Sequence, residues 1–251
     1  MTDLSTIKFF ATKPHTCSYL PEEQATTVFV DPHYEMDGDT YSQLSEFGFR
    51  RSGEHVYRPR CEMCQACVPI RIPVDSFEPS RSQKRSLKRN SDLVMNVVDN
   101  IDTDEHYALY EKYINARHQD GDMYPARRDQ YLDFLTSEWG ITRFLEFRRN
   151  DQLIAVSVTD VLSNGVSAIY AFFDPDQPKR SLGVFNIVFL TQWAKAHGLP
   201  YVYLGYWIRH CQKMAYKVAY KPFQVLVNNH WVTVADFPAK DSSQVDSSPQ
   251  R

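Results

Sequence analysis

The stretch ITRFLEFRRNDQLIAVSVTDVLSNGVSAIYAFFD (141–174) decides the fold. It contains three apolar runs of strand length, which polar pairs separate at Asn150-Asp151 and at Asn164-Gly165. Asn-Gly favours the tight turn of a β-hairpin, and the Val, Ile, Phe and Tyr residues of the runs favour a pleated sheet. The stretch therefore predicts three consecutive strands that pair in an antiparallel meander.

A helix and a fourth strand follow this meander. RSLGVFNIVFLTQWAKAHG (180–198) predicts a long helix that Gly198 and Pro200 terminate, and PYVYLGY (200–206) predicts the strand. A meander followed by a helix and a strand is similar to the central pattern of acyltransferases of the GCN5-related N-acetyltransferase type. We therefore predict an α+β fold with a GCN5-related acyltransferase-like domain, in which helices cover an antiparallel or mixed sheet.

The residues before the meander divide into an irregular part and a helical part. A strand is predicted at TTVFVDP (26–32), and VPIRIPV (68–74) is predicted to be an edge strand because Pro69 and Pro73 cannot donate to a neighbouring strand. Helices are predicted at 40–47, 80–90, 104–119 and 127–137. The predicted organisation has three parts: a small cysteine-containing N-terminal domain (1–78), the acyltransferase-like domain (79–238) and a disordered Ser/Asp/Gln-rich tail (239–251).

Composition excludes several functional classes. Of the 251 residues 43% are hydrophobic, which is enough for a buried core, but no apolar run approaches the roughly 20 residues that span a bilayer. The N-terminal residues contain no continuous apolar segment of a signal peptide, so we expect a cytoplasmic protein with no membrane partner. The net charge is only -3, so any nucleic-acid site must be a local basic patch.

One such patch is predicted on the helix at 80–90. Its five cations recur at positions i, i+3, i+4, i+7 and i+8, which lie on one face of a helix: Arg81, Lys84, Arg85, Lys88 and Arg89. No acidic residue interrupts this segment, so the face suits a phosphate backbone. The alternative is an ordinary solvated helix face.

Cysteines form a cluster at Cys61-x-x-Cys64-x-x-Cys67, in a chain with five cysteines. Three soft ligands at this spacing indicate zinc or an iron–sulfur cluster, and a tetrahedral site needs a fourth ligand. Cys17 is the natural candidate, whereas Cys211 lies in a different part of the chain. The alternative is a group of buried free thiols that pack as small apolar side chains.

Four motifs resemble one enzyme family in content and in order. They are CSYL (17–20), YRPRCEMCQACVPIRIPV (57–74), YAFFDPDQPKRSLGVF (170–185) and YLGYWIRHCQKMAYKVAYKP (203–222). The chain is similar to the arginyl-tRNA–protein transferase family over nearly its whole length, and the last two motifs are long and specific. The compact length and the Cys-x-x-Cys-x-x-Cys run look most like the bacterial branch of the family, the aspartate/glutamate leucyltransferases.

The resemblance implies transfer of leucine from leucyl-tRNA to proteins with N-terminal Asp or Glu, which creates an N-terminus that destabilises them toward proteolysis. The α-amine of the acceptor would attack the carbonyl of the aminoacyl ester directly. An ester is already activated and an α-amine has a pKa of about 8, so neither a covalent intermediate nor a cofactor is required. Zinc or an iron–sulfur cluster, where present, would be held by Cys17, Cys61, Cys64 and Cys67.

The resemblance and the predicted elements together suggest site residues. Asp174, which ends the third strand of the meander, and Tyr206, in the last motif, are the catalytic candidates. The amides that open the helix would face a phosphate or an oxyanion of the donor, at Ser181, Leu182 and Gly183. An acidic acceptor needs a cationic pocket, and the candidates are Arg71, Arg209, Lys213 and Lys217.

Three alternatives stay open. Arginine is the other candidate for the transferred residue, since the residues alone do not separate it from leucine. A small-molecule acetyltransferase would use acetyl-CoA, but RSLG (180–183) is a poor match to the usual Arg/Gln-x-x-Gly-x-Gly/Ala pyrophosphate loop. The third alternative is a metal-containing RNA-binding module without catalysis, which would fail to transfer a labelled amino acid.

Overall fold

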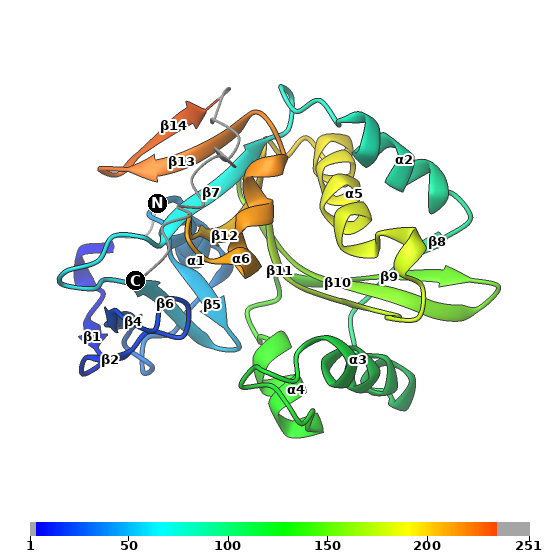
Figure 1. Cartoon of the computed structure of the whole chain (residues 1–251). Helices are drawn as coiled ribbons and strands as arrows, with labels where there is room; N and C mark the ends of the chain where they lie inside the picture. Colours follow the sequence, from blue (N-terminus) through cyan, green and yellow to red (C-terminus); the bar gives the residue numbers. More distant parts are fainter. Residues whose placement is uncertain (1–3, 235–251) are drawn as a thin grey trace, which may run out of the picture.

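A computed structural model describes residues 4–234, so the predicted tail at 239–251 lies outside the described residues. Within residues 4–234 the chain forms three sheets with helices around them, and the predicted α+β class is confirmed (Figure 1). The largest sheet has eight strands in the spatial order β14-β13-β7-β12-β11-β10-β9-β8. Their bounds are β7 (Val68–Pro73), β8 (Val94–Val98), β9 (Thr142–Arg149), β10 (Gln152–Leu162), β11 (Gly165–Phe173), β12 (Tyr201–Trp207), β13 (Phe223–Val227) and β14 (His230–Val234).

The predicted meander forms one half of this large sheet. β9 pairs with β10 and β10 pairs with β11, both in antiparallel fashion. Asn150 and Asp151 turn the chain between β9 and β10 with φ angles of 46° and 65°, a left-handed conformation that Asn and Asp tolerate well. A helix follows β11, and β12 then returns parallel to β11, so the predicted order of meander, helix and strand is confirmed.

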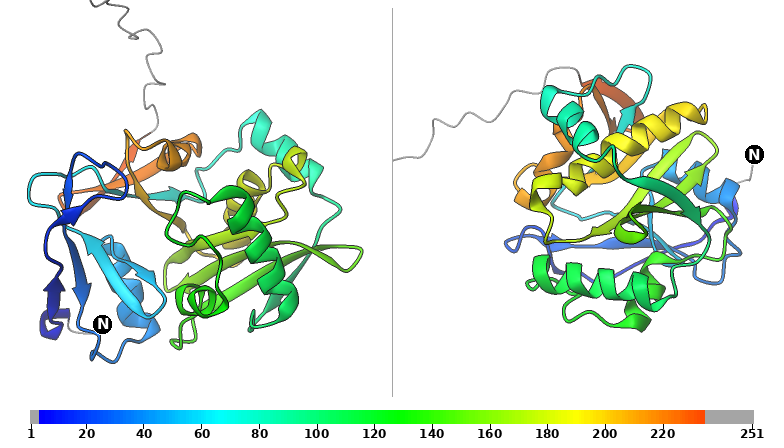
Figure 2. Two further views of the ribbon diagram at one scale, coloured as in Figure 1. Left: turned by 60° about the horizontal axis from the view of Figure 1, so that its bottom comes forward. Right: turned by 90° about the vertical axis from the view of Figure 1, so that its right-hand side faces the viewer.

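Helices cover both faces of the large sheet. In Figure 1, α5 and α2 lie over one face and α3 and α4 over the other, and Figure 2 shows the same two layers from further sides. The helices are α1 (Gly38–Glu46), α2 (Arg81–Arg89), α3 (Asp104–Arg117), α4 (Arg128–Leu135), α5 (Leu182–Ala196), α6 (Gln212–Ala215) and the 3-10 turns η1 (Leu4–Thr6), η2 (Pro178–Arg180) and η3 (Tyr216–Ala219). The predicted helices are therefore confirmed. No helix between residues 4 and 234 has the length and hydrophobicity needed to cross a bilayer.

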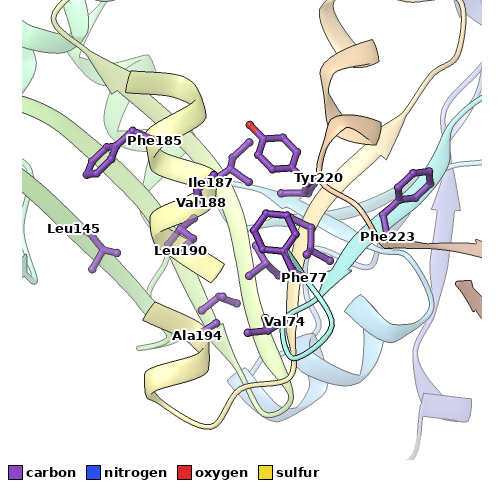
Figure 3. Packing of buried hydrophobic residues seen from close by; sticks show 14 of the residues in the cluster. Val74, Phe77, Leu145, Phe185, Ile187, Val188, Leu190, Ala194, Tyr220 and Phe223 are labelled. Atoms are coloured by element: carbon purple, nitrogen blue, oxygen red, sulfur yellow. The ribbon is translucent and has the colours of Figure 1, made fainter. Parts of the chain in front are cut away.

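The core between α5 and the large sheet fixes the position of α5. Leu182, Phe185 and Val188 on this helix are at most 4% exposed. Figure 3 shows Val188 and its neighbours on α5 gathered with Phe77 and Tyr220, which come from distant parts of the chain. Burying one large apolar side chain contributes about 1.5–3 kcal/mol. The cluster therefore holds the first turn of α5 firmly against the sheet.

Aromatic side chains fill the core on the opposite face, against α3 and α4. The rings of Tyr110 and Tyr131 have centroids 4.6 Å apart, and Phe172 of β11 meets Tyr110 edge-on at 5.6 Å. All three side chains are fully buried. Tilted and edge-on contacts of this kind are the favoured geometries for aromatic pairs. Much of the high Tyr and Phe content therefore serves packing.

A smaller sheet, ordered β1-β4-β6-β5, comes from the N-terminal part of the chain. Arg51 joins it to the large sheet, because Nε and Nη2 of Arg51 donate to the Asp160 carboxylate on β10 at 2.6 and 2.8 Å. Neither side chain is exposed, and we call this contact the junction. The strands are β1 (Phe9–Ala11), β4 (Thr27–Val30), which confirms the strand predicted at 26–32, β5 (Arg50–Ser52) and β6 (His55–Pro59), with a separate pair β2 (His15–Thr16) and β3 (Gln24–Ala25).

The prediction of an edge strand at 68–74 is wrong, because β7 lies inside the large sheet. It pairs with β12 along its length, and with β13 only at Ile70 and Arg71. Pro69 and Pro73 stand outside this short second pairing, so neither has to donate a hydrogen bond to β13. The strand links the N-terminal residues to the large sheet, and a domain division at residue 78 stays a prediction.

Candidate active site

The two parallel strands of the large sheet separate after a short pairing. β11 and β12 pair only over residues 165–167 and 201–203. A cavity of about 790 Å3 lies where they diverge, and residues 168–171 of β11 and 204–206 of β12 line it. We call the diverging part of the two strands the fork and this cavity the fork cavity. A gap between parallel strands exposes backbone and side chains from both to a ligand.

Arg50, the first residue of β5, lies at the fork. Its Nη1 donates to Ser167 Oγ and its Nη2 donates to the carbonyl of Ala168 at 2.6 Å, where the pairing with β12 ends. Gly205 of β12 has a φ of 79°, and a Cβ atom on it would lie 3.3 Å from Arg50 Nε. Glycine suits this position because a side chain would be strained by the left-handed backbone and would crowd the guanidinium.

The start of α5 forms a second wall of the fork cavity. Gly183, Val184 and Asn186 line the cavity, and the first amides of a helix have no partner within it. Asn186 is 5% exposed, and its Oδ1 accepts no hydrogen bond within residues 4–234. Because an unpartnered buried acceptor is costly, Asn186 and these amides together suit a polar ligand.

The three predicted donor residues at this helix start differ in position. Ser181 has φ 53° and ψ 47°, which places the bend between η2 and α5 at this residue. Leu182 is 2% exposed and packs in the core, so only Gly183 lines the cavity. A Cβ atom on Gly183 would lie 3.7 Å from the Phe173 ring, an ordinary contact distance. The protein's own packing therefore tolerates a side chain there, and the space that it would enter is the cavity.

Lys217 of η3 is a buried cation in the wall of the fork cavity. It is 5% exposed, and its Nζ donates to the carbonyl of Tyr206 at 2.6 Å. Burial, and then the positive charge of Arg50, lower the pKa of Lys217 to about 7. A lysine whose pKa is moved this far by burial and a neighbouring charge is typical of a functional site.

The fork cavity has basic lining residues and no Asp or Glu among them. Lys213 lines it, but its Nζ lies 2.7 Å from an Asp120 carboxylate oxygen, which offsets the charge. His118 also lines it, and burial, followed by the charge of Lys213, lowers the pKa of His118, which favours the neutral ring. Arg50 and Lys217 form no ion pair within residues 4–234. Arg50 is therefore an uncompensated cation of the cavity, and Lys217 is a second one in its protonated form.

The rest of the lining is largely apolar and aromatic. It includes Phe134, Ile169, Phe173, Ile187 and Leu190. Ligand cavities commonly combine such a lining with a few polar groups that fix orientation. The fork cavity can therefore accept an aliphatic group and an anion in the same space.

The predicted catalytic residues both have partners within the protein. Asp174 accepts hydrogen bonds from Lys112 Nζ at 2.6 Å and from Gln177 Nε2 at 3.0 Å. Burial alone would raise the pKa of Asp174, but these hydrogen bonds lower it below its usual value. Asp174 does not line the fork cavity, whereas Tyr206 does and donates its hydroxyl hydrogen to the carbonyl of Gly48 at 2.7 Å. The catalytic roles of both residues stay predictions.

The predicted basic helix presents the expected face. α2 begins at a capping box in which Ser80 and Gln83 bind each other's backbone amides. Its five cations are exposed and form no ion pair within residues 4–234: Arg81, Lys84, Arg85, Lys88 and Arg89. Ser80 and Ser82 are exposed and also line the fork cavity, so the cavity reaches the surface at the start of α2.

The buried side of α2 holds the segment before α5. Ser86 Oγ donates to the carbonyl of Ser181 at 3.3 Å, and Asn90 Nδ2 donates to the carbonyl of Arg180 at 2.8 Å. Arg89 donates to the carbonyl of Lys179. The basic face and the start of α5 are therefore positioned by the same contacts.

The predicted acceptor residues divide between the cavity and the rest of the molecule. Arg71 is 5% exposed, lies 3.0 Å from Glu46 Oε1, and places its guanidinium 3.5 Å from the Tyr201 ring centroid and 4.2 Å from that of Trp231. It thus supports the packing around β7 and β12. Arg209 is exposed beyond the end of β12. Neither lines the fork cavity, whereas the other two candidates do: Lys213 and Lys217.

The four predicted ligand cysteines lie in one region. Burial, and then repulsion from the negative charge of neighbouring thiolates at Cys17, Cys61 and Cys64, raise the pKa of Cys67 to about 12. All four are half-buried and free. Within residues 4–234, however, no three side chains of His, Cys, Asp or Glu converge as ligands of a metal ion. Zinc or an iron–sulfur cluster stays a prediction, and the reaction considered below uses neither.

Asn186 and Arg50 are among the cavity residues that the sequence analysis did not identify. Asn186 is a single amide in a strongly apolar helix, and that contrast is a signal that could have found it. Arg50 precedes Arg51 in a short strand, and side chains of consecutive strand residues point to opposite faces. The pair therefore indicates one arginine on each face, although not what each arginine contacts.

Two sequence models of known families match the chain. Residues 15–85 match the model described as the N terminus of arginine-tRNA-protein transferase, and residues 105–227 match the one described as its C terminus. A protein of Teredinibacter turnerae named aspartate/glutamate leucyltransferase is 61% identical over 235 residues, which cover 93% of this chain and 97% of that protein. A protein of the same name from Saccharophagus degradans is 57% identical over 234 residues, covering 93% of this chain and 99% of that protein.

Two solved structures align with 66% of the chain. L-PGS from Bacillus licheniformis aligns over 50% of its own length, with 13% identity and a TM-score of 0.46. A GCN5-related glucosamine N-acetyltransferase region of a fungal multi-domain β-N-acetylglucosaminidase aligns over 20% of that chain, with 10% identity and a TM-score of 0.37.

Proposed function

The chain belongs to the arginine-tRNA-protein transferase family, and from this premise we propose that it moves leucine from leucyl-tRNA onto the α-amine of proteins that begin with Asp or Glu. The predicted family and the predicted transferase activity are both confirmed by the similarities described above. The leucyl donor and the acidic acceptors follow from the name that the relatives share, aspartate/glutamate leucyltransferase. The proposed setting is the cytoplasm, where the new N-terminal leucine would direct the acceptor to proteolysis.

The fork cavity is the observation that carries this proposal. It combines an apolar lining, two uncompensated cations and the first turn of α5 within about 790 Å3. A leucyl side chain suits the apolar lining, an acidic acceptor suits the cations, and an ester carbonyl suits the helix amides. An arginyl donor would bring a further cation to a cavity without an acidic lining residue, so the lining favours leucine over arginine.

The residues of the cavity support direct aminolysis of the ester. The acceptor α-amine attacks the carbonyl carbon of the leucyl ester, the bond from that carbon to the ribose oxygen breaks, and an amide forms. The amides of Gly183 and Val184, at the positive end of the α5 dipole, stabilise the developing oxyanion. Oδ1 of Asn186 accepts a hydrogen bond from the attacking amine and orients its lone pair, and the amine proton passes to the departing ribose oxygen through solvent. No cofactor takes part in these steps.

The exposed cations of α2 provide the proposed contact with tRNA. They begin where the fork cavity reaches the surface, so a 3′ end that entered the cavity would carry its phosphates along this helix. Charge without ion-pair partners is available for phosphate contacts, which release counterions and make binding depend on salt.

Transfer assays with the purified full chain test the proposal. Labelled leucyl-tRNA or arginyl-tRNA is mixed with otherwise identical peptides that begin with Asp, Glu, Lys or Arg. We expect leucine on the Asp and Glu peptides and little product from arginyl-tRNA. Faster transfer of arginine, or a preference for Lys and Arg peptides, would overturn the donor or the acceptor assignment. Retention of tRNA without any peptide product would favour the RNA-binding module.

A further inference from the structure

Arg50 differs in its partners from Arg51 and Arg71, which are buried and each pair with a carboxylate. It is half-buried, and within residues 4–234 it donates to the neutral oxygens of Ser167 and Ala168 and to no carboxylate. A guanidinium carries more N–H donors than these two bonds use. The remaining donors of Arg50 are therefore available to a ligand in the fork cavity.

The charge of Arg50 acts on several groups of the cavity wall. Burial raises the pKa of Tyr57, Tyr206 and Tyr216, and the positive charge of Arg50 opposes that rise in each case. Burial and the same charge both lower the pKa of Lys217. All of these residues line the fork cavity. An anion in the cavity would therefore meet the uncompensated positive field of Arg50, to which Lys217 adds in its protonated form.

We propose that Arg50, together with Lys217, binds the side-chain carboxylate of the acceptor's first residue, and that Arg50 is the residue that selects Asp and Glu. The inference rests on the proposed leucyl transfer. Arg50 offers the planar, forked donor geometry that matches a carboxylate, and the buried Nζ of Lys217 offers a second charge. Asn and Gln have the same shape without the charge, so they would leave both cations unpaired and bind less well.

The acceptor carboxylate is favoured over a tRNA phosphate as this anion. Lys217 is 5% exposed and its Nζ is held by the Tyr206 carbonyl, so only a slender group can approach it. The tRNA backbone is broad, and the exposed cations of α2 are open to it. A side-chain carboxylate on a flexible N-terminus meets the size restriction.

The test compares acidic peptides with their amide counterparts. Transfer of leucine is measured to peptides that begin with Asp, Asn, Glu or Gln, with the wild-type chain, Arg50→Gln and Arg50→Lys. We expect Arg50→Gln to lower kcat/KM for the Asp peptide about 30-fold or more, mainly through KM, and to leave the Asn peptide nearly unchanged. The preference for Asp over Asn thereby collapses, Arg50→Lys restores part of it, and the Kd for leucyl-tRNA stays within about twofold.

Two control variants separate this role from support of the fold. Ser167→Ala removes one partner of Arg50 but keeps its charge, so it should keep the Asp preference. Arg143→Gln removes an arginine that binds the carbonyls of Gly140 and Thr142 outside the cavity, so it should leave all rates unchanged. If Arg50→Gln lowered kcat/KM equally for the Asp and Asn peptides, the proposal would be overturned in favour of a structural role. A weaker Kd for leucyl-tRNA would overturn it in favour of a donor phosphate.

Peptide binding without tRNA distinguishes failure of this subsite from failure of the proposed reaction. Calorimetry measures binding of the Asp peptide to the full wild-type chain and to Arg50→Gln. Suppose that the wild-type chain transfers no leucine but binds the Asp peptide, and that Arg50→Gln does not bind it. This outcome would refute the proposed reaction and support the subsite. Equal binding by both proteins, in a chain that does transfer leucine to Asp peptides, would refute the subsite and leave the reaction standing.

Discussion

Arg50 and Arg51 are neighbours in β5, yet they serve two different regions of the molecule. Arg51 points into the junction, where Asp160 and the carbonyl of Leu135 accept its hydrogen bonds. Arg50 points to the fork, where its acceptors are neutral and a cavity begins. The difference indicates that this fold supplies a carboxylate where an arginine joins its layers, and none where an arginine faces a ligand space.

Arg71 follows the pattern of the junction. It has Glu46 as ion-pair partner, Gln224 as acceptor of its Nε hydrogen, and aromatic rings on which its guanidinium lies. An arginine with a full set of partners has little left to offer a substrate. The sequence motif that contains Arg71 therefore reflects the packing of β7 as much as any role in binding.

Removing the acid from the junction should have the largest effect. Asp160→Asn leaves the buried Arg51 without a counter-charge, and breaking a buried pair in this way costs about 3–5 kcal/mol. Urea denaturation measures the free energy of unfolding. Asp176→Asn is the matched control, because Asp176 pairs with Lys112 while 76% exposed, and should cost less than about 1 kcal/mol. Equal costs would remove the distinction between the junction and an ordinary surface pair.

The buried lysine of the fork should make stability depend on pH. The folded pKa of Lys217 is about 7, below that of an unfolded lysine, so the unfolded chain binds more protons between pH 7 and about 10. Stability should therefore rise with pH across this window, by about 2–4 kcal/mol relative to Lys217→Met, whose stability lacks this contribution. Arg50 opposes protonation of Lys217, whereas Cys67 and Cys211 favour it. Parallel pH profiles of the two proteins would show that Lys217 keeps an ordinary pKa.

Loss of the exposed cations of α2 should weaken the binding of tRNA. Replacing Lys84, Arg85 and Lys88 by Ala removes three unpaired charges but spares Arg89, which holds the Lys179 carbonyl. We expect the slope of log K against log salt to become shallower by about 2–3, and affinity near 0.15 M salt to fall about tenfold. A triple substitution of exposed cations elsewhere is the control, at Lys8, Arg127 and Lys195. An equal loss in the control would show that position on α2 is unimportant.

The smallest expected change is at the first turn of α5. Gly183→Ala adds one carbon at an ordinary contact distance from Phe173, and Ala is favoured over Gly in a helix by up to about 1 kcal/mol. Stability should therefore hold or rise slightly, while leucyl transfer falls about threefold to tenfold because the new carbon enters the fork cavity. Thermal unfolding and kcat/KM give the two readings. Gly121→Ala, outside the cavity lining, should alter neither, and undiminished transfer by Gly183→Ala would argue against close approach of the ester.

Elements with strong local signals were predictable from the sequence. Ser80 and Gln83 form a capping box that marks the start of α2. The hairpin of β10 and β11 forms next to the predicted position, but its turn residues are Ser163 and Asn164, and Gly165 is already the first residue of β11. The hairpin of β13 and β14 was not predicted, although Asn228 and Asn229 turn it with φ angles of 50° and 61°. Its strands are short and its turn lacks glycine, so the local signal is weak.

The fork depends on contacts that no local pattern contains. Arg50 meets Ser167 across 117 residues of sequence, and the position of β7 depends on pairing with strands near the other end of the described chain. The rule that a proline in a strand cannot donate a hydrogen bond to a neighbouring strand is correct for β7. An inner strand can still obey it, because β13 pairs with β7 only at Ile70 and Arg71, away from both prolines. Lys217 could be predicted as a site residue because it belongs to a long family motif that continues beyond β12.

The central place of β7 has a consequence for how the protein is made. Its partners on β12 lie about 130 residues further along the chain, and β13 follows later still. At about 5–20 residues per second, the ribosome needs roughly 6–26 s to deliver the first of these partners. Throughout that interval Ile70 and Ile72, which the finished fold buries almost completely, have no strand to cover them. The nascent chain therefore exposes an apolar segment at β7 for several seconds, and such a segment is one that a ribosome-associated chaperone could cover.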